Sequence, residues 1–541
     1  MATQNSFSDK IALVIDDMPE MRTNLRNQLH TLSITNVSLA ASVREGLENI
    51  RHKRYDIILC DYHLGGSTDG QQFLEFLRTT NSISRATLFI MVTGETGYDH
   101  VITAAECLPD DYLLKPFTGE TLKIRLERLL ERKKRLSTID RLQDEGTWLE
   151  IIVACDEIIA SKDKYVVDAL RIKGNALIMS EQIDLAVEFY QRTLAIRDMP
   201  WVRLGLARAL TLQGHAPQAS TLLTSIIEGN PKFLAAYDLL GRIHTDAGNT
   251  EEALAILDKA CLVAPSSLTR QRSIANLAED AGDLVRVDKA LSTVLRKTKN
   301  SPLRDSMDYA KLCNALTELG EIKRAVDTIK EAKDHFRDSG DVQLIASVEA
   351  IAQKKAGNHK LASDALALAL SNNDLVLPEH INLSIAKACL AHGKSEEAKA
   401  ILKTVIQNNP DSNSIQNTVA QLLKETGGEE AAQTLYEDAV KEVIQLNNEA
   451  IAIAKNGRYA EASKMLNSAA LRLPNNMQVV SNAALSLLVD IFINGFDQAK
   501  AIQAKQFYQI VQKKNRQHPK LVEIEAFQHK IQAKYKTHTS P

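Results

Sequence analysis

Within the first 117 residues, four short apolar runs each end in polar side chains. They occupy residues 10–17, 55–61, 88–93 and 111–117. Apolar runs of this length, bounded by turn-forming residues, are typical of buried β-strands. Segments with helical periodicity separate them, near residues 20–32, 42–53, 71–79 and 99–108. Because strands alternate with helices, this part of the chain is predicted to form βαβ units around a parallel sheet.

The side chains at the ends of the four runs are Asp16 and Asp17, then Asp61, Thr93 and Lys115. Each has an ordinary structural explanation when taken alone, because an aspartate can cap a helix, a threonine favours strands and a lysine is commonly solvated. The carboxyl ends of parallel strands, however, meet at one edge of a sheet, where open α/β sheets bind their ligands. We therefore expect these five side chains to form one site.

Three clustered carboxylates and a lysine suit the transfer of a phosphoryl group to a carboxylate. The carboxylates repel one another, and oxygen ligands of this kind bind Mg²⁺, which commonly uses one or two carboxylates together with phosphate. The metal ion neutralises charge on the transferring group and orients it. A lysine adds a positive charge for the phosphate oxygens, and a hydroxyl can respond to the new acceptor oxygens. The sequence therefore predicts a Mg²⁺-dependent phosphoacceptor site.

Four motifs, VIDD, DIILCD, VTGE and DDYLLKPF, contain these residues and span the predicted domain. Residues 8–130 resemble the receiver domain of bacterial two-component response regulators. The resemblance implies a five-stranded, doubly wound parallel α/β fold. It also implies that a histidine kinase or a phosphotransfer protein phosphorylates Asp61. Receivers of this kind often form homodimers through the face after the fourth helix, and a homodimer is therefore a further expectation.

The resemblance also implies a metal site. Asp16, Asp17 and Asp61 would bind Mg²⁺ together with the backbone carbonyl of His63. The loop after Asp61 lacks the proline that is common in the family, which loosens the loop but removes no ligand. His63 occupies a position where the family varies. Two interpretations stay open for its side chain, which either tunes the lifetime of the phosphoryl group or simply faces solvent.

Three further residues complete the implied site. Thr93 and Tyr112 would form the switch pair that responds to phosphorylation, and Lys115 would contact the phosphoryl group. The family usually has a cis peptide bond before the proline of the last motif, here Lys115–Pro116. Such bonds are essentially confined to proline, so this prediction is a specific one.

After residue 130 the strand pattern stops, and a repeat with a period of 34 residues takes its place. The clearest copies place a small residue, an alanine and a proline at intervals of 12 residues. These copies are Ala207, Ala219 and Pro231; Gly241, Ala253 and Pro265; Ala386, Ala398 and Pro410; and Ala450, Ala462 and Pro474. In most copies a glycine lies seven residues after the small residue, as Gly214 and Gly248 do.

The repeat marks have a direct physical interpretation. The small residue and the alanine allow two helices to pack closely, the glycine ends the first helix in a left-handed cap, and the proline ends the second helix. The pattern resembles tetratricopeptide repeats. It predicts an all-α superhelix of about ten helical pairs, a fold whose curved surface commonly binds proteins. We predict a receiver at residues 1–131, repeats at 132–478, and capping helices with a tail at 479–541.

The junction between the two folds contains no helix breaker, because no Gly or Pro lies between Gly119 and Gly146. A stripe of leucines at helical spacing begins at Leu122 and ends at Leu136, and it should pack on the receiver sheet. One helix could then serve the receiver with its first half and the first repeat with its second half. The alternative is a break at Ser137–Thr138, because serine and threonine are good helix caps.

The overall composition restricts the partners. The formal net charge is −3 and aromatic residues make up 5% of the chain, which gives no general attraction to nucleic acids or membranes. No apolar run reaches roughly 18 residues, and six scattered cysteines without a C-x-x-C pair fit a reducing cytoplasm. We expect a cytoplasmic, non-enzymatic regulator with an unknown protein partner on its repeats. The alternatives are a nucleic-acid-binding regulator that uses the basic runs at 132–135 and 513–516, or a constitutive scaffold whose receiver is a docking module.

Overall fold

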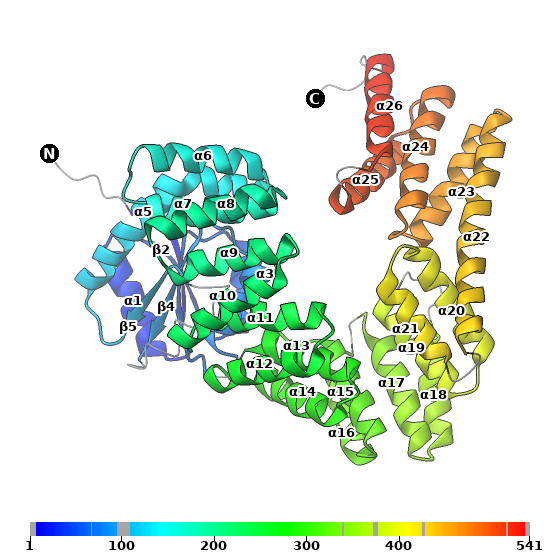
Figure 1. Cartoon of the computed structure of the whole chain (residues 1–541), viewed down its shortest axis with the longest axis horizontal. Coiled ribbons are helices and arrows are strands. Elements are labelled where there is room, and N and C mark those ends of the chain that lie inside the picture. The colour runs from blue at the N-terminus through cyan, green and yellow to red at the C-terminus, as the bar shows by residue number, and fades with distance from the viewer. Residues whose placement is uncertain are drawn as a thin grey trace. The chain divides into compact units, whose positions relative to one another are not determined.

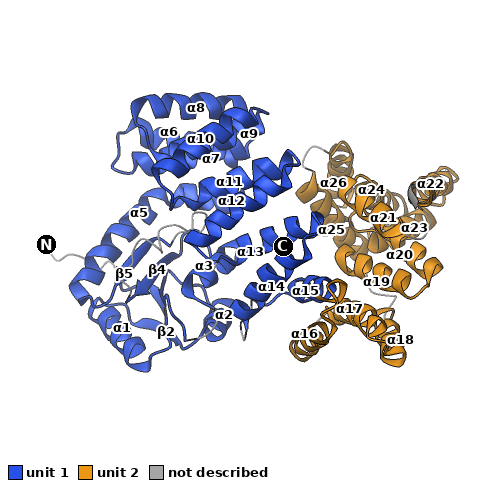
Figure 2. Cartoon of the chain, turned by 60° about the horizontal axis from the view of Figure 1, so that its bottom comes forward, with its two compact units in different colours: residues 1–315 blue, residues 316–541 orange. Residues whose placement is uncertain are grey.

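The fold was analysed in a computed structural model, shown in Figure 1. The residues described are 7–65, 68–94, 109–265, 267–299, 301, 303–337, 340–371, 377–424, 428–515 and 518–535. The helix predicted near 99–108, and with it Glu95 of the third motif, lies outside this set. The chain forms two compact units, residues 1–315 and residues 316–541, which Figure 2 shows in different colours.

A parallel five-stranded sheet forms the N-terminal part of the first unit. Its strands are β1 (Ile11–Ile15), β2 (Asn36–Ala40), β3 (Ile57–Asp61), β4 (Leu88–Thr93) and β5 (Asp111–Leu114). Their spatial order is β2-β1-β3-β4-β5, so the chain winds outward in both directions from β1 and β3. The doubly wound fold is thereby confirmed. The apolar runs had identified every strand except β2, an edge strand in which only Ala40 is fully buried.

Helices cover both faces of this sheet. On one face, α2 (Val43–His52) and α3 (Gly70–Thr79) contribute Leu47 and Phe73 to an apolar core. On the other face, α1 (Pro19–Thr31) contributes Leu25 to a second core. Since β3 and β4 are covered on both sides, these two strands are apolar throughout, and their polar residues are confined to the ends.

A single helix, α5 (Gly119–Glu145), connects the sheet to the repeats. Its first half places Leu122 and Leu126 in the receiver core, whereas its second half places Ile139 in an apolar cluster with the next two helices. The predicted continuous helix is therefore confirmed, and the alternative break at Ser137–Thr138 is wrong. The prediction that the leucine stripe packs on the receiver sheet as far as Leu136 is also wrong, because Leu136 lies in the cluster of the first repeats. The Ser137 hydroxyl donates to the Lys134 carbonyl within the helix, 2.9 Å away, and so caps nothing.

The remaining helices of the first unit follow in antiparallel pairs. They are α6 (Trp148–Ala160), α7 (Val166–Met179), α8 (Ile183–Ile196), α9 (Pro200–Leu212), α10 (Ala216–Gly229), α11 (Leu234–Asp246), α12 (Thr250–Val263), α13 (Leu268–Asp280) and α14 (Leu284–Thr298). Helix α15 (Ser306–Glu318) contains the boundary between the units.

The second unit is helical throughout its described residues. Its helices are α16 (Ile322–His335), α17 (Val342–Lys355), α18 (His359–Ala369), α19 (Glu379–Ala391), α20 (Ser395–Asn408), α21 (Asn413–Leu423), α22 (Gly428–Lys455), α23 (Tyr459–Arg472), α24 (Met477–Asn494), α25 (Gln498–Lys514) and α26 (Lys520–Tyr535).

The repeat marks do what their residue types predict. Ala207 and Ala219 are fully buried on α9 and α10, and a side chain at Gly241 would meet Leu257 at 3.1 Å. Glycines that follow first helices in the described residues adopt a left-handed conformation, as at Gly214 (φ +88°) and Gly248 (φ +77°). This conformation is the one that ends a helix and that a side chain disfavours. The all-α repeat architecture is thereby confirmed.

Two helices of the second unit depart from a simple repeat. The predicted copy that begins with Ala450 and the copy before it share α22. This helix is the second helix of the earlier copy and the first helix of the later one. Helix α24 is apolar and long enough to cross a membrane by composition alone. Half of its apolar window is buried, however, in a core that it forms with α23, α25 and α26. Its Asp490 is fully buried and accepts a hydrogen bond from Lys500 at 2.8 Å.

Candidate phosphoacceptor site

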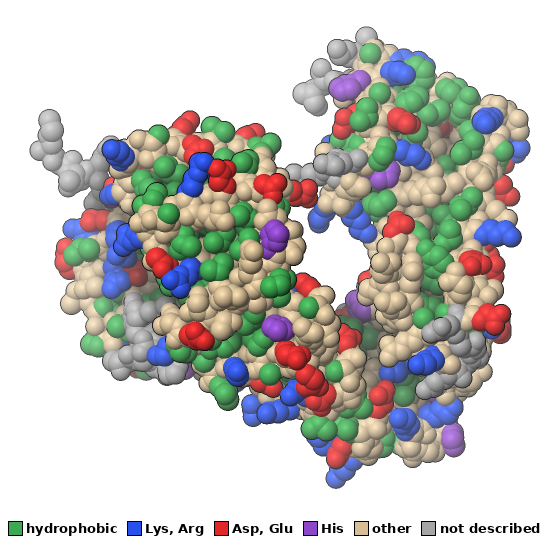
Figure 3. Space-filling view, viewed as in Figure 1, with side chains coloured by type: hydrophobic (Ala, Val, Ile, Leu, Met, Phe, Trp, Pro, Cys, Tyr) green, Lys and Arg blue, Asp and Glu red, His purple; other side chains and the backbone are tan. Residues whose placement is uncertain are grey.

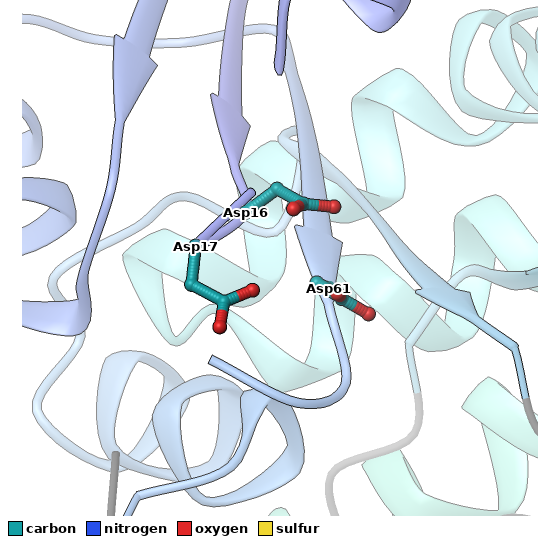
Figure 4. Close-up of side chains that lie close together, drawn as sticks. All are labelled: Asp16, Asp17 and Asp61. Atoms are coloured by element: carbon teal, nitrogen blue, oxygen red, sulfur yellow. The ribbon is translucent and has the colours of Figure 1, made fainter. Parts of the chain in front are cut away.

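Three carboxylates converge at the carboxyl ends of β1 and β3 (Figure 4). Asp16 and Asp17 directly follow β1, and Asp61 is the last residue of β3. These strands are parallel neighbours, so the ends of the two strands lie level with each other. One oxygen from each carboxylate lies within 4.8 Å of the others. Asp16 and Asp61 are buried, whereas Asp17 is exposed, so the cluster opens to solvent on one side.

Lys115 provides the positive charge of the cluster. It follows β5, and its Nζ donates to Asp16 Oδ2 at 2.9 Å and to Asp61 Oδ2 at 3.0 Å. Burial raises the pKa of Asp61, the hydrogen bond and charge of Lys115 lower it, and the charge of Asp16 raises it again, so that its net pKa is above the ordinary value. Burial lowers the pKa of Lys115, but both carboxylates outweigh this effect and raise it overall. The lysine therefore stays protonated between two carboxylates.

The switch candidates lie on the two adjacent strands. Thr93 ends β4 and is 1% exposed, and Tyr112 lies in β5 and is 8% exposed. The Lys115 backbone N–H donates to the Thr93 carbonyl at 2.7 Å, which joins the ends of the two strands. The predicted cis peptide Lys115–Pro116 is present and is thereby confirmed.

The loop between β3 and α3 packs closely on the carboxylates. At Gly65 (φ +63°), a side chain would meet Asp17 Oδ2 at 2.4 Å, and at Gly70 it would meet the Asp61 carbonyl oxygen at 2.4 Å. The sequence assigned neither glycine a role in the site. The only signal was that both glycines follow the candidate acceptor in one loop. His63 is exposed, and a backbone hydrogen bond from it helps to lower the pKa of Asp61.

The residues present fit a magnesium ion. Their side-chain donors are all carboxylate oxygens, close enough together to share one small cation, and exposed Asp17 leaves an entry side. Mg²⁺ prefers oxygen ligands and keeps several waters, which such an open site allows. Lys115 already neutralises part of the negative charge, so a divalent ion would complete the compensation.

Comparison with known proteins places this site in a family. A family model described as "Response regulator receiver domain" matches residues 12–127. Chemotaxis protein CheY of Pseudomonas aeruginosa is 31% identical over 120 residues, which are 22% of this chain and 95% of that protein. The chain belongs to the response regulators. Chemotaxis protein CheY-3 of Vibrio cholerae is 28% identical over 120 residues, which are 22% of this chain and 91% of CheY-3.

The helical part of this response regulator matches a second family. Models described as "Tetratricopeptide repeat" match residues 177–243, 234–267 and 382–412. The chain is therefore a two-component response regulator in which a receiver is fused to repeats of a type that mediates protein interactions. The predicted domain limits at 131/132 and 478/479 stay predictions, and α5 runs through the first of them.

Solved structures resemble the two parts of this response regulator separately. The receiver domain of Francisella response regulator 1452 is 27% identical, with 23% of this chain and 98% of that structure covered at a TM-score of 0.21. The C-terminal part of a TPR repeat-containing protein from Cytophaga hutchinsonii is 14% identical, with 52% of this chain and 99% of that structure covered at a TM-score of 0.32.

Proposed function

We propose that this response regulator accepts a phosphoryl group on Asp61 from a histidine kinase or a phosphotransfer protein, and that its repeats convey the signal by binding another protein. The observation that supports Asp61 as the acceptor is its contact with Lys115 beside Asp16 and Asp17. A surface aspartate that only caps a helix needs neither a half-buried lysine nor two further carboxylates. The receiver supplies the acceptor, and no further catalytic activity is proposed for the chain.

The proposed reaction is a displacement at phosphorus. An Oδ atom of Asp61 attacks the phosphorus, the P–N bond to the donor histidine breaks, and the imidazole leaves with the electron pair. The product is an acyl phosphate on Asp61. Lys115 Nζ, which already contacts Asp61 Oδ2, is positioned to pair with a phosphoryl oxygen. Because the nucleophile must be ionised, the lysine also serves to limit the rise in the pKa of Asp61 that burial causes.

Magnesium would be held by Asp16, Asp17, Asp61 and the backbone carbonyl of His63. When bound, the ion neutralises charge on the transferring group. Thr93 and Tyr112 are proposed as the switch pair, because both are buried on the strands next to the acceptor. The hydroxyl of Thr93, at the end of β4, can donate a hydrogen bond to the oxygens that phosphorylation adds to Asp61.

Magnesium binding gives a prediction that does not depend on a phosphodonor. Asp17→Asn should abolish the thermal stabilisation of the receiver by Mg²⁺, because it removes a proposed ligand of the ion. Asp17 is exposed, so its replacement leaves the core intact. A ligand that binds only the folded state at about 100 times its Kd stabilises by about 2.7 kcal/mol. The measurement is the unfolding temperature with and without Mg²⁺. Glu48→Gln, at an exposed acid on α2, should keep the full stabilisation. Equal stabilisation of the Asp17→Asn protein would contradict the metal assignment.

A protein partner is proposed for the repeats rather than a nucleic acid. The basic run at the receiver junction is engaged with acids: Arg132 with Asp168, Lys133 with Asp110, and Arg135 with Asp163. On the face that Figure 3 shows, positive and negative side chains are interspersed. The second unit has an open cleft of about 720 Å³ that carries both apolar and polar groups, including Ile401, Leu446 and Glu442. Such a mixed cleft suits a peptide better than a phosphate backbone.

Weak nucleic-acid binding is therefore the second prediction. Neither random duplex DNA nor single-stranded RNA should bind with a Kd tighter than about 10⁻⁴–10⁻⁶ M at physiological salt, the non-specific range. Fluorescence anisotropy with labelled oligonucleotides measures this Kd. A sub-micromolar Kd with a preference for sequence would favour the nucleic-acid-binding alternative.

Location in the cytoplasm and homodimer formation through the receiver are further parts of the proposal.

A further inference from the structure

Helix α3 of the receiver begins at the phosphoacceptor loop and also approaches the repeats within the first unit. At its start, Asp69 caps the helix by accepting from the Gln72 backbone N–H at 2.8 Å, and the Gly70 N–H donates to the Tyr62 carbonyl at 2.8 Å. The helix is thus anchored to the residue that follows Asp61. Figure 2 shows α3 next to α13, the first helix of a repeat pair.

A hydrogen bond connects α3 to α13, and the charge of one lysine on α14 acts on the N-cap of α3. The Thr269 hydroxyl, in the first turn of α13, donates to the Glu75 carboxylate in α3. Burial raises the pKa of Asp69, and the positive charge of Lys297 near the end of α14 is one of the effects that oppose this rise. Since α13 and α14 are antiparallel, the start of one lies beside the end of the other. Glu75 therefore contacts the start of α13, and Asp69, the N-cap of α3, lies within electrostatic range of the end of α14.

Arginines reinforce the positive charge at this end of the pair. Arg270 donates to both carboxylate oxygens of Asp238 at 2.8 and 2.9 Å, yet its Nη1 is buried without a hydrogen-bond partner. Arg272 pairs with Asp308 at 2.8 Å. Burial lowers the pKa of each arginine, and its paired aspartate, with a smaller contribution from Glu75, raises it above the ordinary value.

We propose that the receiver is itself a ligand of the repeats: the face of α3 that carries Glu75 docks on the end of the α13–α14 pair that carries Thr269 and Arg270. The charges on the two sides are complementary, and the buried Nη1 of Arg270 gives this end an additional donor for a carboxylate. Docking forms a second connection between the receiver and the repeats, in addition to the covalent connection through α5. A partner that needs this end of α13 and α14 must displace α3.

Site-specific cross-linking in the full chain tests the docking. Glu75→Cys and Thr269→Cys are combined in a Cys107→Ser, Cys261→Ser background, because the other cysteines are buried and Cys261 lies 3.5 Å from Gln271. A short bifunctional maleimide is used, since a disulfide demands Cα atoms within about 4.4–6.8 Å. We expect an intramolecular 75–269 cross-link, identified by peptide mass spectrometry.

The matched control pairs Glu75→Cys with Val285→Cys. Val285 is 68% exposed and lies in the first turn of α14, roughly three helical turns from Lys297. This pair should give at most about a tenth of the intramolecular product. Equal yields from the two pairs would overturn the docked arrangement. A cross-link that joins two chains, recognised by its dimer mass and its dependence on concentration, would also overturn it.

Charge reversal provides a second measurement without cysteines. Glu75→Lys should release α3 and accelerate hydrogen exchange of residues 268–280 by roughly threefold or more, because locally weakened packing raises the opened population. Glu48→Lys, on α2, should leave this exchange unchanged. Unchanged exchange in the Glu75→Lys protein would contradict the proposal. None of these measurements requires a phosphodonor, so failure of the docking and failure of phosphorylation at Asp61 are separable.

Discussion

Asp61→Ala is expected to abolish phosphorylation of this response regulator completely. The physical reason is that the nucleophilic oxygen is removed, while Asp16, Asp17 and Lys115 stay in place. Acetyl phosphate with Mg²⁺ should add one phosphoryl group to the natural chain, which intact mass spectrometry detects directly. The receiver should tolerate the change, because Asp61 is the last residue of β3 and its removal relieves repulsion within a cluster of three carboxylates.

Two controls make the result specific to Asp61. Glu48→Gln changes an exposed acid of the same domain and should be labelled like the natural chain. Equal labelling of the Asp61→Ala protein would show that another residue accepts the group. The raised pKa of Asp61 adds a pH dependence. As the pH falls, this carboxylate takes up a proton at a higher pH than an ordinary aspartate does, so the rate of labelling should decline earlier on the acid side.

Insertion of two glycines after Leu136 should uncouple the first repeats from the receiver. The insertion lies within α5, after the leucines of the receiver core and between Leu136 and Ile139, which both belong to the cluster of the first repeats. Two extra helical residues rotate the second half of α5 by about 200° and shift it by about 3 Å, and each interior glycine costs about 1 kcal/mol. We expect phosphorylation to change the hydrogen exchange of α6 and α7 in the natural chain, and this difference to vanish in the variant.

The control inserts the same two glycines after Gly495, in the turn between α24 and α25, and should keep the difference in α6 and α7. The contact of α3 with α13 predicts a further distinction. Exchange in α13 should still respond to phosphorylation after the insertion at Leu136, because Glu75 connects to Thr269 without α5. An unaltered response in α6 and α7 would mean that α5 does not carry the signal.

The sequence alone determined the elements whose signal is local. An apolar run that ends in a charge identifies a buried strand because both faces of a parallel sheet are covered. Asp16, Asp17, Asp61, Thr93 and Lys115 were therefore placed at one edge of the sheet before any contact was known. The repeat pattern was predictable for a similar reason, since a left-handed helix cap strongly favours glycine and a close contact between helices favours a small residue.

Other features depended on tertiary contacts. Edge strand β2 has a weak apolar pattern because most of its side chains are only partly buried. The closeness of Gly65 to Asp17, and of Gly70 to Asp61, arises only when the loop folds over the strand ends. Whether α5 continues past Ser137 was decided by packing, because its two halves enter different cores. The approach of Glu75 to Thr269, 194 residues apart in the chain, has no local signal at all, since the stacking of the intervening helices sets it.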